Sequence, residues 1–445
     1  MKLSQTASLI QGRLTGSDVD FNGVSTDTRT LQPGELFIAI KGANFDGHDF
    51  IARAEEQKAA ALLVQHPVKS QLPYVLVNNT ITALGQLATH HRQQFSIPLI
   101  GVTGSCGKTT VKAMIASILS HCGEVLFSES SFNNDIGLPL TLMRLNPSHQ
   151  YAVIEMGTNH FGEIAALTQI ARPTVALINN AAAAHLEGLG DVKGVSRAKG
   201  EIFQGLTADG VGIINADDTY ASYWETLVTP RKMLHFSIAK NADIMAKNIQ
   251  LDANGKAHFT LITPQGETVI KLPLLGRHNV ANALAAASAA CAVHAPLSAI
   301  KAGLEGVIAV KKRLNEYSAY NGARLIDDTY NANPLSFKAA IEILANLPGE
   351  RILVLGDMRE LGNQEQHYHQ ELGLEARRLG IERVFAFGEL SKATTQAFGA
   401  QGQHFQDHET LIQTLKTNLN DNTTVLVKGS RSMHMERVVE ALIVN

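Results

Sequence analysis

Short apolar runs alternate with amphipathic stretches along much of this chain of 445 residues. In the middle of the chain these runs are typical of buried strands, and a helical pattern separates each from the next. They are Pro98–Val102, Tyr151–Met156, Val175–Ile178 and Val211–Ile214. Such alternation predicts parallel strands joined by right-handed crossovers, with helices on both faces of the sheet.

The pattern changes before and after this region. Residues 1–83 contain apolar runs at 35–40 and 60–64, which predict a small α/β domain. Between about residues 245 and 275, alternating segments are separated by Asn254-Gly255 and Gln265-Gly266, which predicts antiparallel hairpins. An alanine-rich helix is expected to begin at Asn279.

From residue 313 onward the alternation of strand and helix patterns returns, with runs at 325–326, 352–355, 384–387 and 425–427. We therefore predict an α/β fold of three domains. These are a small N-terminal α/β domain (1–83), a central parallel-sheet domain with an antiparallel addition (84–312) and a Rossmann-like C-terminal domain (313–445). Two such sheets in series favour a ligand cleft between them.

A glycine-rich segment, Thr103-Gly104-Ser105-Cys106-Gly107-Lys108-Thr109-Thr110, joins the first central strand to an amphipathic helix. Its free backbone N–H groups, the helix N-terminus and the Lys108 ammonium suit a nucleotide polyphosphate, and the Thr109 hydroxyl suits Mg²⁺. We predict a P-loop for a nucleotide polyphosphate in this central domain, with an ordinary βα turn as the alternative. The common P-loop pattern has glycine where this chain has Val102, so the loop is a variant form. The predicted phosphate-binding residues are Gly104, Ser105, Cys106, Gly107, Lys108, Thr109 and Thr110.

Composition narrows the class of protein. The chain is 45% hydrophobic and 18% charged, which is ordinary for a globular protein. Its net charge of −3 gives no general attraction to nucleic acid or to acidic membranes, so an anionic ligand needs a local site. The three cysteines are scattered, and no apolar run is long enough to span a bilayer. We expect a cytoplasmic protein without membrane insertion.

Candidate metal ligands follow the central strands. Glu155 ends one strand and His185 follows another, so both are expected at the carboxyl edge of the sheet, beside Thr109. A carboxylate and a hydroxyl suit Mg²⁺, whereas imidazole is less usual there. The alternative for each residue is a satisfied polar group at a strand end.

Polar segments in the C-terminal region also follow strands. Two segments contain more charged and polar side chains than a connecting loop requires. They are residues 327–334 (Asp-Asp-Thr-Tyr-Asn-Ala-Asn-Pro) and 356–362 (Gly-Asp-Met-Arg-Glu-Leu-Gly). The basic stretch 311–313 is equally consistent with an exposed linker and with a phosphate contact. We interpret 367–369 (His-Tyr-His) as surface, and Lys199 on its own as a solvated cation.

Taken in order, these segments resemble the Mur ligase family, the ATP-dependent amide-forming enzymes of peptidoglycan synthesis. The resemblance extends from Asp27 to Arg431. Besides the P-loop, it depends on residues 155–157 (Glu-Met-Gly), 185–188 (His-Leu-Glu-Gly), 198–201 (Ala-Lys-Gly-Glu), 276–279 (Gly-Arg-His-Asn), Asn282 and Arg313.

The resemblance implies roles that the residues alone do not. It implies catalytic roles for Lys108, Glu155, His185 and Lys199. Lys199 is expected to be carbamylated and to hold Mg²⁺ together with Thr109, Glu155 and His185. Asn279, Asn282, Arg313, Asp328 and Tyr330 are expected to contact ATP. The expected substrate-binding residues are Ser25, Thr26, Asp27, Thr28, Arg29, Asn44, Asn134, Asn331, Asn333, Ser430 and Arg431.

Within the family, residues 327–334 and 356–362 resemble the acid–D-amino-acid ligase that adds D-alanyl-D-alanine to UDP-N-acetylmuramoyl tripeptide. The resemblance implies an acyl phosphate intermediate, ADP and phosphate as products, and a monomer. The ligase that adds the third residue is the nearest relative, but its Asp-Asn-Pro-Arg element is absent. Two alternatives stay open: a folate polyglutamylating ligase, which needs no uridine-binding first domain, and a nucleotide-dependent switch without ligase activity.

Overall fold

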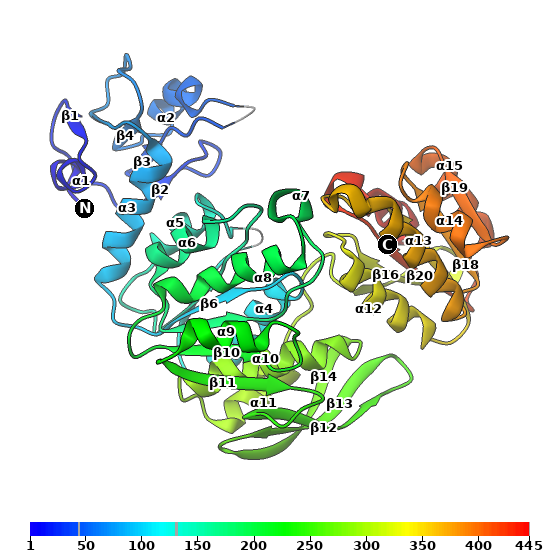
Figure 1. Cartoon of the computed structure of the whole chain (residues 1–445). Coiled ribbons are helices and arrows are strands. Elements are labelled where there is room, and N and C mark those ends of the chain that lie inside the picture. The colour runs from blue at the N-terminus through cyan, green and yellow to red at the C-terminus, as the bar shows by residue number, and fades with distance from the viewer. Residues whose placement is uncertain (43–44, 130–131, 445) are drawn as a thin grey trace.

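The computed structural model describes residues 1–42, 45–129 and 132–444. In this part of the chain the strands form three sheets, of five, nine and six strands. Figure 1 shows three bodies in chain order, with the N-terminal and C-terminal domains on different sides of the central domain. The predicted three-domain α/β fold is confirmed.

The N-terminal domain is built on a sheet of order β1-β5-β4-β3-β2, in which only the β1–β5 pair is antiparallel. Leu36 and Leu63 pack on one face, and Phe37 and Leu62 on the other, so an unbroken apolar run is what these strands need. The elements are α1 (Leu3–Leu9), β1 (Arg13–Thr15), β2 (Val24–Ser25), β3 (Leu36–Ile38), α2 (Ile51–Glu56), β4 (Ala61–Val64) and β5 (Tyr74–Leu76).

Helix α3 (Thr80–Gln93) carries the chain into the central domain, and Asn79 caps it by accepting a hydrogen bond from Thr82 N–H at 2.9 Å. The predicted division between residues 83 and 84 lies inside this helix. The domain limits stay a prediction.

The central sheet has the order β14-β13-β12-β11-β10-β9-β6-β8-β7. It is parallel from β7 to β12, and β12, β13 and β14 form the predicted antiparallel addition. Its strands are β6 (Leu99–Thr103), β7 (Val125–Phe127), β8 (Tyr151–Glu155), β9 (Val175–Ile178), β10 (Val211–Asn215), β11 (Lys232–Ser237), β12 (Ile244–Leu251), β13 (Lys256–Thr263) and β14 (Gly266–Leu275).

The helices of the central domain cover this sheet. The predicted apolar face of α4, including Val111, Met114 and Ile118, is fully buried in the core. The helices are α4 (Lys108–Leu119), α5 (Gly137–Leu142), α6 (Glu163–Ala171), α7 (Leu186–Leu189), α8 (Val192–Gly200), α9 (Ala221–Val228), α10 (His278–Ala292) and α11 (Leu297–Glu305). The alanine-rich helix α10 therefore begins one residue before the predicted start.

The C-terminal sheet has the order β15-β16-β20-β17-β18-β19 and is parallel except for the β15–β16 pair. Its strands are β15 (Asn315–Ser318), β16 (Arg324–Asp328), β17 (Glu350–Gly356), β18 (Arg383–Phe387), β19 (Gly402–Phe405) and β20 (Thr423–Lys428). Its helices are α12 (Pro334–Ala345), α13 (Glu365–Arg378), α14 (Lys392–Phe398), α15 (His408–Asn418) and α16 (Glu436–Leu442).

The interpretation of residues 367–369 as surface is wrong for His369. Its side chain is fully buried, and Nε2 accepts a hydrogen bond from Met358 N–H at 3.0 Å. His367, two residues earlier, is exposed and pairs with Glu371 on the same helix. Neighbouring histidines on α13 thus face the core and the solvent, because a two-residue step turns a helix by more than half a circle.

Candidate active site

The P-loop follows β6 and is closed by Gly107, the residue before α4, which has a φ of 79°. A Cβ atom at this position would lie 2.4 Å from Asn282 Oδ1 and 2.5 Å from Asn179 Nδ2, so only glycine fits. Lys108 Nζ donates a hydrogen bond to Gly104 O at 2.7 Å. The predicted glycine-rich cradle at a helix N-terminus is therefore formed.

Two asparagines that the sequence analysis missed hold this loop in place. Asn180 Oδ1 accepts from Cys106 N–H, and Asn179 Nδ2 donates to Cys106 O, both at 2.9 Å. They directly follow β9, at the same edge of the sheet as the loop. This position after a strand was the one feature of the sequence that could have identified them. Ser105 Oγ donates to Ala182 O at 3.1 Å, which adds a further tie to this segment.

Glu155 ends β8 beside the P-loop and is only 2% exposed. Asn133 Nδ2 donates to its Oε1 at 2.9 Å, and Lys112 Nζ lies 3.4 Å from its Oε2. Burial by itself raises the pKa of this carboxyl, but Lys112, Lys108 and Arg313 outweigh burial, so the pKa is lowered overall. Glu155 is therefore an ionised carboxylate among cations, as a metal ligand must be.

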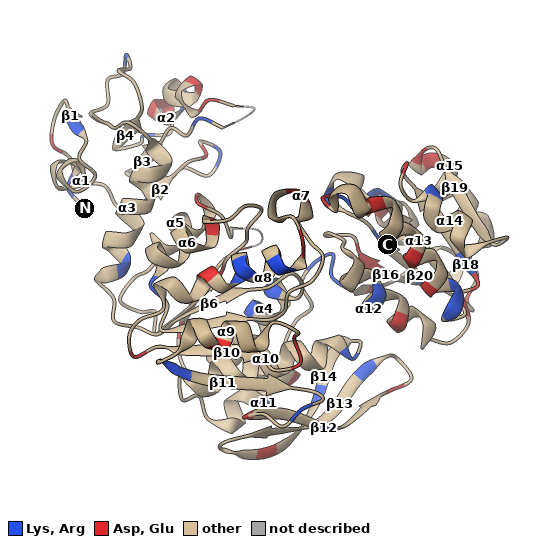
Figure 2. Cartoon of the chain, in the orientation of Figure 1, with Lys and Arg blue, Asp and Glu red and all other residues tan. Residues whose placement is uncertain are grey.

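Lys199 lies at the end of α8 and is fully buried, so the interpretation of this residue as a solvated cation is wrong, because the helix turns its side chain into the core. Among the described residues, no group accepts or donates a hydrogen bond at its Nζ. Burial, and next the charge of Lys108, lower the pKa of this amine well below its usual value. A buried amine without a partner, whose pKa is lowered, fits the chemistry of carbamylation, which starts from the neutral amine. Figure 2 shows that basic residues occur on both α4 and α8.

The predicted metal ligands His185 and Thr109 both contact the C-terminal domain. His185 Nδ1 lies 2.6 Å from Glu360 Oε2, and this hydrogen bond lowers the pKa of the Glu360 carboxyl. Arg313 Nη2 donates to Thr109 Oγ1 at 2.8 Å. The sequence analysis missed Glu360, which stands in the polar segment after β17 but gave no sign of its partner 175 positions away.

The C-terminal domain reaches the P-loop through residues at the start of the domain and around the end of β16. The Arg313 guanidinium lies over the Tyr330 ring, 4.3 Å from its centroid. Asn333 caps α12 in a capping box, with Pro334 at the first helical position. Its Nδ2 also lies 3.1 Å from Cys106 Sγ. Of the predicted ATP and substrate residues of this domain, Arg313 and Asn333 therefore contact the P-loop directly.

Asp328 and Asn331 are held by Lys428, a residue that the sequence analysis did not select. Lys428 Nζ donates to Asp328 Oδ2 at 2.6 Å and to Asn331 O at 3.0 Å. Ser430, two residues further on, accepts from Arg359 N–H at its Oγ, 2.9 Å away. Arg431 is largely exposed, and its guanidinium lies 3.5 Å from Glu436 Oε1.

A cavity of about 1370 Å³ lies between the central and C-terminal domains. The predicted residues lining it are Ser105, Cys106, Gly107, Lys108, Thr110, Asn134, Glu155, His185, Asn279, Asn282, Arg313, Asp328, Tyr330, Asn331, Asn333, Ser430 and Arg431. Gly104, Thr109 and Lys199 are not among its lining residues, although Thr109 accepts a hydrogen bond from Arg313, which is. Asn279 and Asn282 are buried and hydrogen-bonded to each other, with Asn282 Nδ2 donating to Asn279 Oδ1 at 2.8 Å.

The predicted substrate residues 25–29 lie in the N-terminal domain, apart from this cavity. Ser25 Oγ donates to Asp27 O at 3.1 Å, and Arg29 makes a two-pronged ion pair with the Asp27 carboxylate. Thr28 is buried and Thr26 is half-buried. Asn44 lies outside the described residues. The structure thus does not bring the 25–29 segment together with the P-loop residues.

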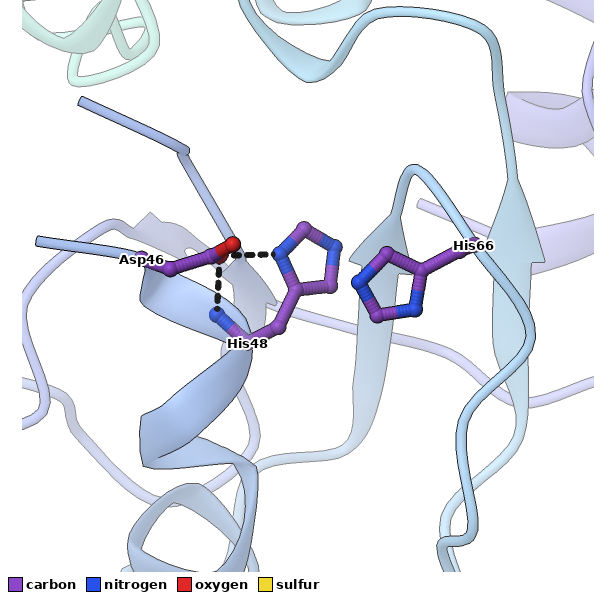
Figure 3. A group of neighbouring side chains, drawn as sticks. All are labelled: Asp46, His48 and His66. Atoms are coloured by element: carbon purple, nitrogen blue, oxygen red, sulfur yellow. Dashed lines mark hydrogen bonds and ion pairs between the residues drawn. The ribbon is translucent and has the colours of Figure 1, made fainter. Parts of the chain in front are cut away.

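The same domain holds a group of possible metal ligands, Asp46, His48 and His66 (Figure 3). Both ring nitrogens of His48 are already used: Nδ1 pairs with Asp46 Oδ1 at 2.6 Å, and Nε2 accepts from Gln65 N–H at 3.0 Å. His66 stacks on His48 with ring centroids 4.2 Å apart. Because a metal would have to displace the Gln65 bond, this group is a hydrogen-bonded loop anchor.

Three family models match the chain. They are the "Mur ligase family, catalytic domain" at residues 20–92, the "Mur ligase middle domain" at 102–290, and the "Mur ligase, glutamate ligase domain" at 312–431. A UDP-N-acetylmuramoyl-tripeptide–D-alanyl-D-alanine ligase from Escherichia coli is 48% identical over 99% of this chain and 98% of its own.

The chain belongs to the Mur ligase family.

Solved structures of relatives agree with this assignment. MurF from Acinetobacter baumannii is 34% identical, with a TM-score of 0.92, over 98% of this chain and 97% of its own. MurF from Thermotoga maritima, solved in complex with ADP, is 26% identical with a TM-score of 0.83 over 94% of this chain and 96% of its own. The predicted family is confirmed, whereas the roles of single residues stay predictions.

Proposed function

We propose that this chain is the ATP-dependent Mur ligase that joins D-alanyl-D-alanine to UDP-N-acetylmuramoyl tripeptide, in peptidoglycan precursor synthesis. Two observations support the proposal. The chain is 48% identical to the Escherichia coli ligase over 99% of its length, and the P-loop lines the cavity between the domains. The ADP complex of the Thermotoga maritima relative supports ATP use.

Activation of the substrate carboxylate is the difficult step, because an oxide-like oxygen is a poor leaving group. Bound ATP supplies a phosphoryl group that turns this carboxylate into an acyl phosphate, so that phosphate becomes the leaving group. Two anions must approach one another in that step. Lys108, Lys112 and Arg313 surround Glu155 with positive charge, which offsets this repulsion and stabilises the transferring oxygens.

The residues present fit a divalent cation beside the phosphates. Glu155 supplies an ionised carboxylate, Thr109 a hydroxyl, and His185 a ring nitrogen. Carbamylation of the unpartnered Lys199 amine adds a further carboxylate-like ligand. Mg²⁺ held there adds positive charge next to the transferring phosphoryl group.

Amide formation needs an attacking amine and the exclusion of water. The amine of D-alanyl-D-alanine has a pKa near 8 by analogy with α-amino groups, so a general base contributes modestly at neutral pH. An apolar cluster joins the two domains beside the cavity, with Leu186 and Leu189 of the central domain packed with Met358 and Leu361 of the C-terminal domain. Such packing shields an acyl phosphate from hydrolysis.

We further propose that residues 1–83 hold the uridine diphosphate part of the substrate, and that Ser430, Arg431, Asn331 and Asn333 border the dipeptide site. The proposal includes a cytoplasmic monomer without membrane insertion. None of the helices in the described part of the chain has the length and apolar character that a membrane crossing requires.

The test is phosphate release by the purified chain with ATP and Mg²⁺, in the presence or absence of UDP-N-acetylmuramoyl tripeptide and D-alanyl-D-alanine. We expect release only with both acceptors, and a product whose mass is that of the two substrates minus water. Lys108→Ala removes this release. Release that ignores both acceptors indicates a nucleotide switch, and release that follows folate and glutamate indicates the folate ligase; either result contradicts the proposal.

A further inference from the structure

His185 and Glu360 join the central and C-terminal domains at one point. His185 immediately precedes α7, and Glu360 lies in the loop after β17. Besides the 2.6 Å contact between His185 Nδ1 and Glu360 Oε2, Leu186 N–H donates to Glu360 O at 2.8 Å. The side chain and the backbone of Glu360 therefore both engage α7, which lies on the side of the central domain facing the C-terminal domain (Figure 1).

The backbone at this junction is held in an uncommon conformation on both sides. His185 has a φ of 55° and Glu360 a φ of 66°, the left-handed region that side chains other than glycine rarely adopt. Such a backbone conformation is strained in a residue with a side chain, and it persists where the surroundings fix it. The surroundings here are the interdomain apolar cluster, in which Leu186 and Leu361 are almost fully buried. The junction is a defined structure.

The contact also fixes which nitrogen of His185 is available. A carboxylate only accepts hydrogen bonds, so Nδ1 carries a proton, and in the ring with a single proton Nε2 keeps the lone pair that a metal ion needs. In the described part of the chain, Nε2 has no hydrogen-bond partner, and His185 lines the same cavity as Lys108 and Glu155. Histidines that bind metals usually donate their other ring N–H to a carboxylate in this way.

We propose that Glu360 is a positioning residue for His185, holding its ring so that Nε2 is presented to a divalent cation beside the nucleotide phosphates. The inference rests on the proposed function and adds one property to that function. Because His185 belongs to the central domain and Glu360 to the C-terminal domain, the cation site is complete only when the two domains are docked. Cation binding and domain docking are then thermodynamically linked.

The first experiment measures Mn²⁺ binding to the full chain by electron paramagnetic resonance, with a non-hydrolysable ATP analogue present. We expect Glu360→Ala to weaken Mn²⁺ binding by about 10- to 100-fold, the range usual for loss of a carboxylate behind a metal-bound histidine. Glu360→Gln keeps an oxygen that accepts from Nδ1–H and is expected to lose less. Unchanged Mn²⁺ affinity in Glu360→Ala overturns the proposal.

The chain offers a matched control for this substitution. Glu371 pairs with His367 at 3.2 Å on α13, and both side chains are exposed. Glu371→Ala therefore removes a histidine–carboxylate pair from the same domain without touching the cavity. We expect Glu371→Ala to bind Mn²⁺ as the unaltered chain does. Equal losses in Glu371→Ala and Glu360→Ala contradict a specific role for Glu360.

A double-mutant cycle shows whether Glu360 acts through His185. We expect Glu360→Ala to cause no further loss of Mn²⁺ affinity in a His185→Ala background, and additive losses contradict the proposal. Small-angle X-ray scattering checks that Glu360→Ala still docks its domains, since the bond from Leu186 N–H to the Glu360 carbonyl remains. If the unaltered chain shows no acceptor-dependent phosphate release, the proposed function is overturned. If release is normal but Glu360→Ala binds Mn²⁺ with unchanged affinity, only the positioning role is overturned.

Discussion

Lys199 of the central domain and Lys428 of the C-terminal domain are both buried, yet their surroundings are opposite. Lys428 Nζ lies 2.6 Å from the Asp328 carboxylate and also donates to Asn331 O. Lys199 Nζ has no partner among the described residues, and the cation Lys108 lies near enough to lower its pKa further. Burial of Lys428 is tolerated because its charge is paired, whereas burial of Lys199 favours the neutral form of its amine.

The difference separates a structural lysine from a reactive one. Lys428 fixes the segment after β16 that contacts the P-loop, so its role is to hold a charged neighbour in place. The Lys199 amine holds no neighbour in place, and its lowered pKa favours the neutral form that carbamylation requires. We propose that Lys199 is a modification site, whose modified side chain would contribute a carboxylate to the cation site.

The largest expected effect is on catalysis. We expect Lys199→Ala to lower kcat of acceptor-dependent phosphate release by about 10³-fold, comparable with the loss of a group that stabilises a transferring phosphoryl. A short carboxylic acid added to the assay is expected to restore part of the activity, because it supplies the missing carboxylate. The measurement is kcat as a function of added acetate, and no rescue at any concentration contradicts a metal-binding carbamate.

A smaller effect, which differs between the two lysines, is expected for the free energy of unfolding. Lys428→Met leaves the Asp328 carboxylate unpaired and is expected to lower the free energy of unfolding by about 3 kcal/mol. Lys199→Met replaces an unpartnered amine with an apolar side chain of similar shape, which is expected to be neutral or stabilising. Urea unfolding without bicarbonate or Mg²⁺ measures both, and equal destabilisation by the two variants breaks the comparison.

The pH dependence of stability sharpens the picture around Lys428. Burial lowers the pKa of His278, which lies near Asp328 and Lys428, to about 4. Because the unfolded chain binds this proton near pH 6.5, stability is lost as pH falls from about 6.5 to about 4, by about 1–2 kcal/mol at pH 5. Unfolding curves at pH 7 and 5 are expected to show this loss. His278→Gln is expected to remove the loss, and Lys428→Met is expected to reduce it. A His278→Gln variant with the same pH dependence as the unaltered chain contradicts this assignment.

The sequence predicted the local parts of the fold and site well. The P-loop, the apolar face of α4, the hairpins at Gly255 and Gly266, and Pro334 at the start of α12 each depend on neighbouring residues. Lys112 was missed although it stands one helical turn after Lys108, because a charged residue next to the apolar face of a helix is normally interpreted as a surface position.

The contacts between domains could not be predicted in this way. Arg313 and Thr109 are 204 positions apart, and Asn333 and Cys106 are 227 apart. Polarity marks such residues as candidates, but their partners depend on how two independent sheets dock. Lys199 and His369 are buried because their helices pack against other elements, and the local pattern of apolar residues does not predict that packing.

The most direct test of the central claim is ¹³C NMR of the chain equilibrated with ¹³C-bicarbonate near pH 8. The account predicts a carbamate resonance in the unaltered chain and in Lys428→Met, and its disappearance in Lys199→Ala. A spectrum without a carbamate signal, or one whose signal survives Lys199→Ala, contradicts the account.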